Sequence, residues 1–194
     1  MTQPPSIVPP PSDLPGLPHE AQDADDPSAL RDDLFLVTAT GAPDDPAATT
    51  LSYRNSPVVL VTFAGNRLTR EATRAYQAEF GIGVMDWRML VMLTRSPGCP
   101  VAAATRVTGL DKAAVSRSLQ RLETNGLARA LATTGGDERR KAWYLTPEGQ
   151  ALHARILPRA LERQRDLLKG FTEAETVSFT QYLQRFLDNA NALD

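Results

Sequence analysis

The segment from Asp111 to Gly149 restricts the possible folds of this chain more than any other. It begins with an amphipathic pattern in which apolar residues recur at spacings of four and three, at Val115, Leu119 and Leu122. Asp111 suits the N-cap of that helix, and Gly126 can take the left-handed conformation that follows a helix C-terminus. Two strand candidates, LARALAT and AWYLT, then flank the polar turn TGGDERRK, which predicts a β-hairpin.

The outward face of the predicted helix has the chemistry of a surface that reads DNA. It carries basic, small and amide side chains and no acid, namely Lys112, Ala113, Ser116, Arg117, Gln120 and Arg121. Arg117 and Gln120 can donate hydrogen bonds to base edges, whereas Lys112 and Arg121 can reach phosphates. The alternative is an ordinary solvated polar face.

The tip of the predicted hairpin is basic and carries Arg139, Arg140 and Lys141. Beside a helix in the major groove, such a loop would lie near the neighbouring backbone and minor groove, where a narrow groove attracts arginine. The alternative is a solvated hairpin tip without a function.

Three shorter helical patterns precede this segment. Pro57 fits a first helical position, and apolar residues at spacings of three and four continue to Phe80, before the glycines of FGIG. The sequence VMDWRMLVMLTR, residues 84–95, is apolar on nearly every side and predicts a buried second helix. Pro100 begins a short third helix, PVAAATRV, and a tight turn then leads to Asp111. This third helix and the helix that begins at Asp111 form a helix-turn-helix pattern.

The chain after the hairpin predicts two further helices. Thr146 and Pro147 can begin a long helix that reaches Lys169. Thr172 and Glu175 fit a capping box for the last helix. The apolar residues of that helix are Val177, Phe179, Tyr182, Leu183, Phe186 and Leu187. This is more apolar surface than a monomer of this size is expected to expose.

The first 56 residues differ from the rest in charge and composition. They hold two basic and nine acidic residues, a net charge of −7, whereas residues 57–194 carry +5. The overall charge of −2 therefore does not exclude nucleic acid as a partner. Eleven of the fifteen prolines lie in the first 57 residues, which predicts a largely disordered arm or acidic tail. Its one apolar stretch, Ala29 to Val37, could dock on the body as a short helix or strand.

Few residues suited to catalysis or metal binding are present. The chain has two histidines, His19 and His153, and one cysteine, Cys99, so neither a zinc site nor a disulfide framework can be assembled. The carboxylate pairs at 25–26 and 44–45 lie in low-complexity sequence and are expected to be solvated. We therefore expect no enzyme, no cofactor and no metal. Without a signal sequence or a long apolar segment, we expect a cytoplasmic protein with no membrane partner.

Two segments, DKAAVSRSLQRLETNGLARA and GGDERRKAWYLTPEGQAL, resemble the winged helix-turn-helix core of the MarR-type transcription regulators. The matching elements are Val115-Ser116-Arg117, Leu122-Glu123, Gly126-Leu127, Asp137-Glu138-Arg139 and Leu145-Thr146-Pro147-Glu148-Gly149. The upstream FGIGVMDWRMLVML is similar to the second helix of that family. The resemblance covers residues 57–194, about 70% of the chain. Two departures are the long proline-rich arm and an alanine-rich third helix.

This resemblance implies a fold class and a domain organisation. The fold is mainly α with a small β-hairpin wing: a winged helix-turn-helix domain plus N- and C-terminal dimerisation helices. Residues 1–56 form the arm, 57–83 the first dimerisation helix, 84–146 the DNA-binding domain and 147–194 the C-terminal dimerisation helices. In the family, the arginine of Asp-Xaa-Arg enters the minor groove and the aspartate orients it, and these roles fall on Arg139 and Asp137.

The implied function is a ligand-responsive repressor that binds a pseudo-palindromic operator in double-stranded DNA as a homodimer. The family commonly senses small aromatic or phenolic acids between the dimer helices and the winged domain. The effector candidates here are Arg67, Tyr76, Trp87 and Arg88, and the alternative for the two rings is a place in the core. Cys99, next to the third helix, is either a redox-active thiol or an ordinary buried residue. The alternative function is a winged-helix protein-interaction module, which would present apolar or acidic residues on the outward helix face.

Overall fold

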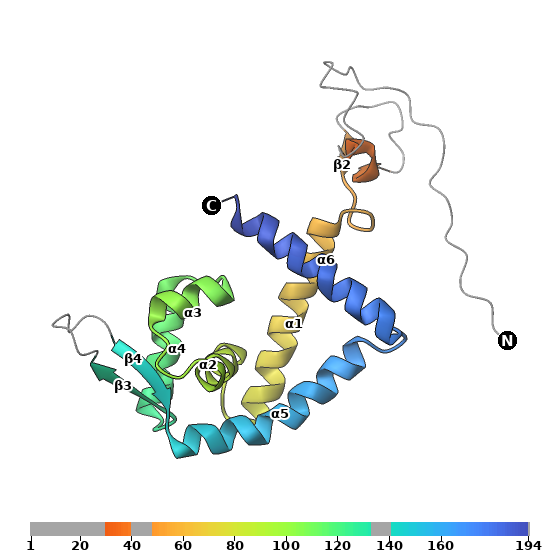
Figure 1. Cartoon of the computed structure of the whole chain (residues 1–194). Helices are drawn as coiled ribbons and strands as arrows, with labels where there is room; N and C mark the ends of the chain where they lie inside the picture. Colours follow the sequence, from red (N-terminus) through yellow and green to blue (C-terminus); the bar gives the residue numbers. More distant parts are fainter. Residues whose placement is uncertain (1–29, 40–47, 133–140, 194) are drawn as a thin grey trace. The chain divides into compact units, whose positions relative to one another are not determined.

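The structure is a computed structural model that describes residues 30–39, 48–132 and 141–193 (Figure 1). The chain divides into two compact units, Met1–Arg67 and Leu68–Asp194. Helix α1 (Pro57–Phe80) begins in the first unit and ends in the second. Within the described residues, no helix is both long and apolar enough to cross a lipid bilayer.

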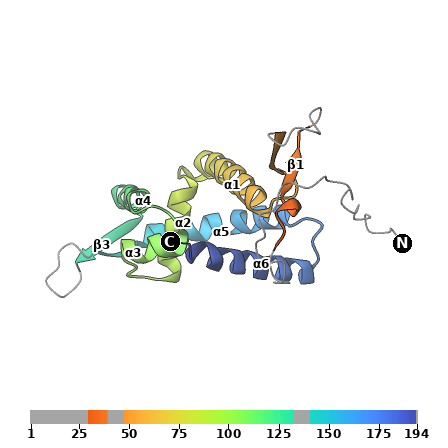
Figure 2. The same cartoon turned by 90° about the horizontal axis from the view of Figure 1, so that it is seen from above.

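The second unit combines helices with one small antiparallel hairpin. Its elements after α1 are α2 (Val84–Arg95), α3 (Val101–Thr108), α4 (Lys112–Thr124), β3 (Ala128–Ala132), β4 (Lys141–Leu145), α5 (Pro147–Leu167) and α6 (Glu173–Asn191). Helices α3 and α4 pack together across a tight turn, and Ala130 of β3 pairs with Trp143 of β4. Helix α2 contacts α4, α5 and β4 (Figures 1 and 2). The expected mainly α fold with a hairpin wing is therefore confirmed.

The core of the second unit forms around α2. Met89 and Leu90 of α2 and Ile156 of α5 are almost completely buried, and so are the three inward residues predicted for α4, Val115, Leu119 and Leu122. Burial of a side chain of this size contributes about 1.5–3 kcal/mol to stability. Because α4 gives only one face to this core, its opposite face remains in solvent.

Side-chain caps begin α4, α5 and α6 at the predicted residues. Asp111 Oδ1 accepts a hydrogen bond from the Ala114 N–H at 2.8 Å. Thr146 caps α5 in the same way, and a reciprocal capping box of Thr172 and Glu175 begins α6. Each cap pairs a backbone donor that the helix itself cannot satisfy.

Two helix boundaries differ from those expected. Helix α3 begins at Val101, because Pro100 is extended, with φ −76° and ψ 157°, and is the N-cap residue. Helix α5 ends at Leu167 rather than at Lys169, because Leu168 is already the C-cap residue. Gly170 then takes a positive φ of 93° before α6 begins.

The described part of the first unit contains a short hairpin that leads into α1. A 3₁₀ turn, η1 (Asp32–Leu34), precedes strand β1 (Leu36–Thr38), which pairs antiparallel with β2 (Thr49–Leu51). The apolar stretch Ala29 to Val37 was expected to form a short helix or strand. Its described part, from Leu30 onward, contains the 3₁₀ turn and most of strand β1. Of the predicted arm, residues 1–56, the segments 30–39 and 48–56 are described and contain this turn and hairpin, and the rest lies outside the described residues.

Gly149, in the first turn of α5, lies against the main chain of Leu127. A Cβ at position 149 would lie 1.9 Å from the Leu127 carbonyl oxygen, which already accepts the Thr146 N–H at 3.1 Å. We expect Gly149→Ala to lower the free energy of unfolding by about 1–3 kcal/mol, because the two backbone segments must move apart. Helix propensity alone would favour alanine by about 1 kcal/mol. Urea denaturation at a fixed protein concentration measures the change.

The control is Gln150→Ala, one residue further along α5 at an exposed position. This substitution should change the free energy of unfolding by less than about 0.5 kcal/mol. A Gly149→Ala protein as stable as the wild type would contradict the close approach of α5 to Leu127.

Candidate nucleic-acid interface

Helix α4 presents the six predicted DNA-facing residues on its outer side. Lys112, Ala113, Arg117, Gln120 and Arg121 are exposed, and Ser116 is half-buried. An open hollow on this side is lined by Arg117, Gln120, Arg121, Thr124 and Asn125. Glu123, the one acidic residue of α4, accepts the Ala130 N–H of β3 at 3.4 Å and so is engaged with the hairpin. The outer side therefore offers ammonium, guanidinium and amide donors.

A buried carboxylate on α2 binds one edge of Arg121. Nη2 of Arg121 donates to Oδ1 of Asp86 at 2.7 Å, and Nε of Arg121 lies 3.4 Å from Oδ2. The Ser118 hydroxyl donates to the same Oδ1 at 2.6 Å. The side chain of Asp86 is 8% exposed and that of Arg121 is 51% exposed. About half of the Arg121 side chain thus remains exposed to solvent.

This contact couples the orientation of α4 to α2. A buried carboxylate is costly unless it is paired, so Asp86 favours the arrangement in which both donors reach it. Ser118 and Arg121 are three residues apart on the same side of α4, so the two bonds oppose rotation of the helix about its axis. Asp86 was not among the predicted site residues. Its signal was an acid within VMDWRML, an otherwise apolar and buried segment.

The base of the β3–β4 hairpin is fixed by Trp143. Its side chain is 4% exposed, its carbonyl accepts the Gly98 N–H at 2.8 Å, and its N–H donates to the Cys99 carbonyl at 3.3 Å. The connection between α2 and α3 therefore pairs with β4. Lys141, the first residue of β4, is exposed. The other predicted wing residues, Asp137, Arg139 and Arg140, lie outside the described residues.

Two of the four effector candidates, Tyr76 and Trp87, meet in the core. Their ring centroids lie 6.0 Å apart in an edge-on arrangement, and Trp87 stacks on His153 at 5.2 Å. Tyr76 is 4% exposed and Trp87 is 9% exposed. Burial also raises the pKa of the Tyr76 hydroxyl, although Arg163 and Arg159 oppose this shift. These surroundings are those of core residues, the alternative that the sequence left open.

The two arginine candidates lie in different surroundings. Arg88 donates from Nη2 to the Thr69 hydroxyl at 3.3 Å and from Nη1 to the sulfur of Met85 at 3.4 Å. Arg67 is exposed and belongs to the first unit. Arg88 thus already has partners on α1 and α2.

Cys99 lies buried immediately before α3. Burial raises the pKa of its thiol, and Sγ lies 3.4 Å from the Pro100 carbonyl oxygen. The thiol is therefore protonated at neutral pH, whereas a reactive cysteine needs an accessible thiolate. This favours the ordinary buried residue over the redox-active thiol. Within the described part of the chain, no three His, Cys, Asp or Glu side chains are grouped as metal ligands.

The comparisons with known proteins show similarity to one family of regulators. The MarR family model matches residues 80–140. A MarR/EmrR family transcriptional regulator from Acinetobacter sp. ADP1 is 30% identical, with 73% of this chain and 99% of that chain covered and a TM-score of 0.68. No curated protein matches the chain in sequence.

Two more distant structures share the fold. A MarR family transcriptional regulator from Silicibacter pomeroyi is 24% identical, covers 71% of this chain and 92% of its own, and has a TM-score of 0.62. BpsR from Bordetella bronchiseptica, whose DNA binding is regulated by 6-hydroxynicotinic acid, is 22% identical. It covers 66% of this chain and 98% of its own, with a TM-score of 0.57.

The contact among Asp86, Ser118 and Arg121 can be tested by stability measurements. We expect Asp86→Ala to lower the free energy of unfolding by about 1–3 kcal/mol, because the buried Ser118 hydroxyl loses its acceptor. A double-mutant cycle with Arg121→Ala, followed by urea denaturation, should give a coupling of at least about 0.5 kcal/mol. Lys112→Ala removes an exposed cation from the same helix and should change stability by less than about 0.5 kcal/mol. Strictly additive effects at 86 and 121 would show that the pair does not hold α4.

The half-buried position of His153 predicts a pH dependence. Desolvation lowers the pKa of its imidazole below the ordinary 6.5. The unfolded chain then binds a proton at a higher pH than the folded chain, so stability falls as the pH decreases below about 6.5 and levels off below the folded pKa. His153→Gln should lack this part of the dependence. Urea denaturation of both proteins between about pH 7.5 and 5.5 tests this, and equal losses in both would contradict it.

Proposed function

This chain belongs to the MarR family of transcriptional regulators, and we propose that it is a ligand-responsive repressor that binds a pseudo-palindromic operator as a homodimer. Members of this family are DNA-binding regulators and not enzymes. The observation that carries the proposal is the donor-rich outer side of α4, held toward solvent by the bond of Arg121 to Asp86. A surface of this kind meets the requirement of a helix that enters the major groove.

Recognition is divided between base contacts and phosphate contacts. The residues nearest the start of α4 have short side chains, Ala113 and Ser116, so the helix can approach the groove closely. Arg117 and Gln120 are assigned to base edges, because guanidinium and amide groups form paired hydrogen bonds with bases there. Lys112 is assigned to phosphate. Arg121 is also assigned to phosphate, through the part of its guanidinium that Asp86 leaves exposed.

The wing supplies the second DNA contact in this proposal. Arg139 enters the minor groove and is oriented by Asp137, while Arg140 and Lys141 contact phosphates. Support comes from the sequence of the turn and from the exposed position of Lys141 at the start of β4. Because β3 contacts α4, the hairpin begins and ends beside the recognition helix. An arginine there is attracted most strongly by a narrow, A·T-rich minor groove.

The homodimer is supported by the apolar surface of α6. No side chain of this helix is buried, and its exposed apolar residues include the six predicted from the sequence. An apolar patch of this extent is typical of an association surface. A two-fold dimer would place the two copies of α4 about 34–36 Å apart, which matches half-sites separated by one turn of DNA.

The ligand-responsive part of the proposal concerns Arg67, Tyr76, Trp87 and Arg88. The regulation of BpsR by 6-hydroxynicotinic acid shows that a protein of this fold responds to a small aromatic acid. In this chain, a ligand would have to displace the buried rings of Tyr76 and Trp87 or bind at one of the two arginines. A thermal-shift series with aromatic carboxylates tests this, since a ligand at 100 times its Kd stabilises the folded state by about 2.7 kcal/mol.

Specific DNA recognition predicts unequal effects on two duplexes. On a duplex selected by the protein from a randomised library, Arg117→Ala or Gln120→Ala should weaken binding by about 1–3 kcal/mol, and by less on random DNA. Lys112→Ala should weaken both similarly and flatten the salt dependence by about 0.9 in log–log slope. Fluorescence anisotropy at several salt concentrations measures these differences.

Two results would change the assignment. Equal losses on the selected and random duplexes would place Arg117 and Gln120 at phosphates. A wild-type protein that prefers no selected duplex over random DNA would favour the winged-helix protein-interaction module.

A further inference from the structure

The first unit has no apolar core among its described residues. In 30–39 and 48–67, the buried side chains are the two serines Ser52 and Ser56, and no large apolar side chain is buried. Exposed apolar side chains are instead frequent in this short segment and include Leu34, Val37, Leu51, Tyr53, Val58 and Phe63. This distribution is the reverse of that in the second unit, where the apolar side chains of α2 and α4 are buried.

The hairpin of the first unit is too small to be stable by itself. Strands β1 and β2 contain three residues each, and their pairing places Leu36 opposite Leu51. A lone two-stranded hairpin is marginal in water and needs a helix or further strands against one face. Leu51 is 52% exposed, so the apolar face of the hairpin is not covered within the described residues.

Local hydrogen bonds nevertheless join this hairpin firmly to α1. The Ser52 N–H donates to the Phe35 carbonyl at 2.7 Å, and the Ser56 N–H donates to the Ser52 carbonyl at 3.2 Å. The Ser52 hydroxyl accepts the N–H groups of Arg54 and Asn55 at 3.2 and 3.0 Å. These bonds define the turn between β2 and α1. The hairpin is therefore attached to the N-terminus of α1 by an ordered turn.

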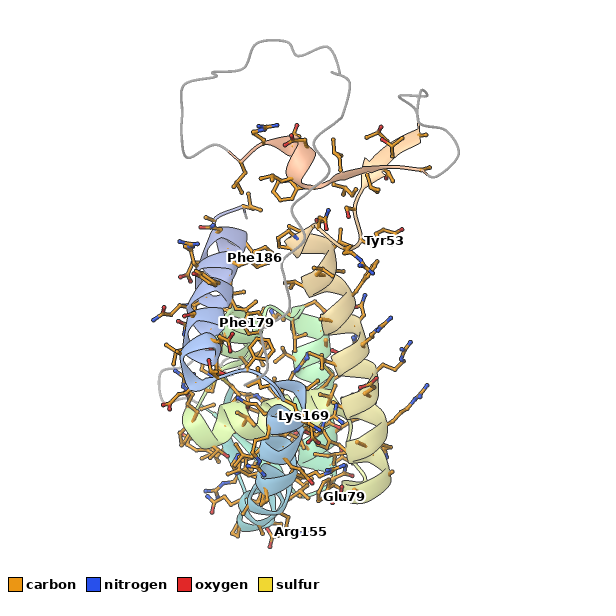
Figure 3. The ribbon with its side chains drawn as sticks, turned by 90° about the vertical axis from the view of Figure 1, so that its right-hand side faces the viewer. Tyr53, Glu79, Arg155, Lys169, Phe179 and Phe186 are labelled. Carbon is orange, nitrogen blue, oxygen red and sulfur yellow. The ribbon has the colours of Figure 1, made fainter. Side chains whose placement is uncertain are left out.

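An aromatic contact continues the apolar surface from this turn onto α1. The ring centroids of Tyr53 and Phe63 lie 5.2 Å apart in an edge-on arrangement. Both residues are exposed to solvent apart from this contact. Figure 3 labels Tyr53 at this position. Leu51, two residues before Tyr53, is exposed as well, and we call the apolar side chains of Leu51, Tyr53 and Phe63 the arm surface.

Helix α6 carries the second uncovered apolar surface of the chain. Phe179, Leu183 and Phe186 follow spacings of four and three, which places them on one side of the helix. All three are exposed, at 43%, 38% and 36%. Figure 3 labels Phe179 and Phe186 along this helix. This side of α6 is called the α6 surface.

We propose that the arm surface of one copy packs on the α6 surface of a second copy, so that the β1–β2 hairpin is a dimerisation arm. The inference rests on the homodimer of the proposed function. In a two-fold dimer, a contact between two different surfaces occurs twice, so a single association covers both arms and both α6 helices. The arm is continuous with α1, whose exposed Val58 and Phe63 belong to the segment expected to form the dimer. DNA, with its charged backbone, would not cover an apolar surface of this kind.

A pair of glutamate substitutions on adjacent residues tests the arm. Leu51→Glu places a carboxylate in the proposed contact and should raise the dimer Kd about tenfold or more, since a buried unpaired charge costs more than the 1.4 kcal/mol of one such factor. The control is Thr50→Glu, which puts the same charge on the opposite face of the same exposed strand. It should change the Kd by less than about threefold. Sedimentation velocity over a concentration series measures both values.

A crosslinking experiment identifies the surface that the arm contacts. A benzophenone amino acid replaces Leu51 in the full chain, and this protein is mixed with an isotopically heavy wild-type protein before illumination. Crosslinked peptides that join position 51 to residues 173–191 of the heavy copy are expected. Crosslinks that stay within the unlabelled copy, or that reach only other segments of the heavy copy, would overturn the proposal.

The outcomes separate this inference from the proposed function. If the wild type is a dimer and Leu51→Glu leaves its Kd unchanged, the arm is not part of the interface and the proposed DNA-binding homodimer stands. If the wild type sediments as a monomer at every concentration, the arm proposal and the homodimer are both wrong. Selection of a duplex from the randomised library reports on DNA recognition independently of either result.

Discussion

The surface proposed to face DNA depends on the orientation of α4 against α2. Three apolar side chains hold one face of α4 in the core, but apolar burial is non-directional and tolerates some rotation of the helix. The carboxylate of Asp86 supplies a direction, because it accepts bonds from Ser118 and Arg121, one turn apart on α4. With the inner face fixed in this way, Arg117 and Gln120 must point outward. The buried acid thus sets the geometry of the surface, whereas the apolar contacts supply most of the stability.

The same scaffold fixes the hairpin and explains the behaviour of Cys99. Trp143 of β4 exchanges a backbone hydrogen bond with the segment before α3, so the hairpin base cannot move without disturbing the helix-turn-helix. Cys99 takes part in this pairing, and its side chain lies inside the core, where burial raises the pKa of the thiol. Cys99 is therefore poorly placed for redox chemistry, which requires an accessible thiolate.

In the proposed function, association and DNA contact fall on different parts of the chain. The elements from α2 to β4 form a core with a donor-rich outer surface, while apolar side chains remain exposed on α6 and on the segment that leads into α1. An apolar surface is covered by another apolar surface, and a basic surface is neutralised by phosphate. If the two surfaces act as proposed, one chain binds a second copy and DNA at the same time, because the two partners use different side chains.

For the second unit, the sequence by itself determined the elements and the composition of each face. Asp111, Thr146 and the capping box at Thr172 act on backbone groups a few residues away, so local pattern was sufficient to place the starts of three helices. The start of α3 and the end of α5 differ from the predicted residues by one and two positions. Helix boundaries commonly vary by this amount, because the terminal turns fray.

Only the tertiary structure decided which residues meet across the core. Asp86 lies 32 and 35 residues from the two donors it binds, and no local spacing identifies a partner at that distance. Nor could the sequence choose between a ligand site and the core for Tyr76 and Trp87, because an aromatic residue on a helix face serves either purpose. That choice depends on what packs against the rings, and in the folded chain Trp87 stacks on His153, from a helix more than sixty residues further along.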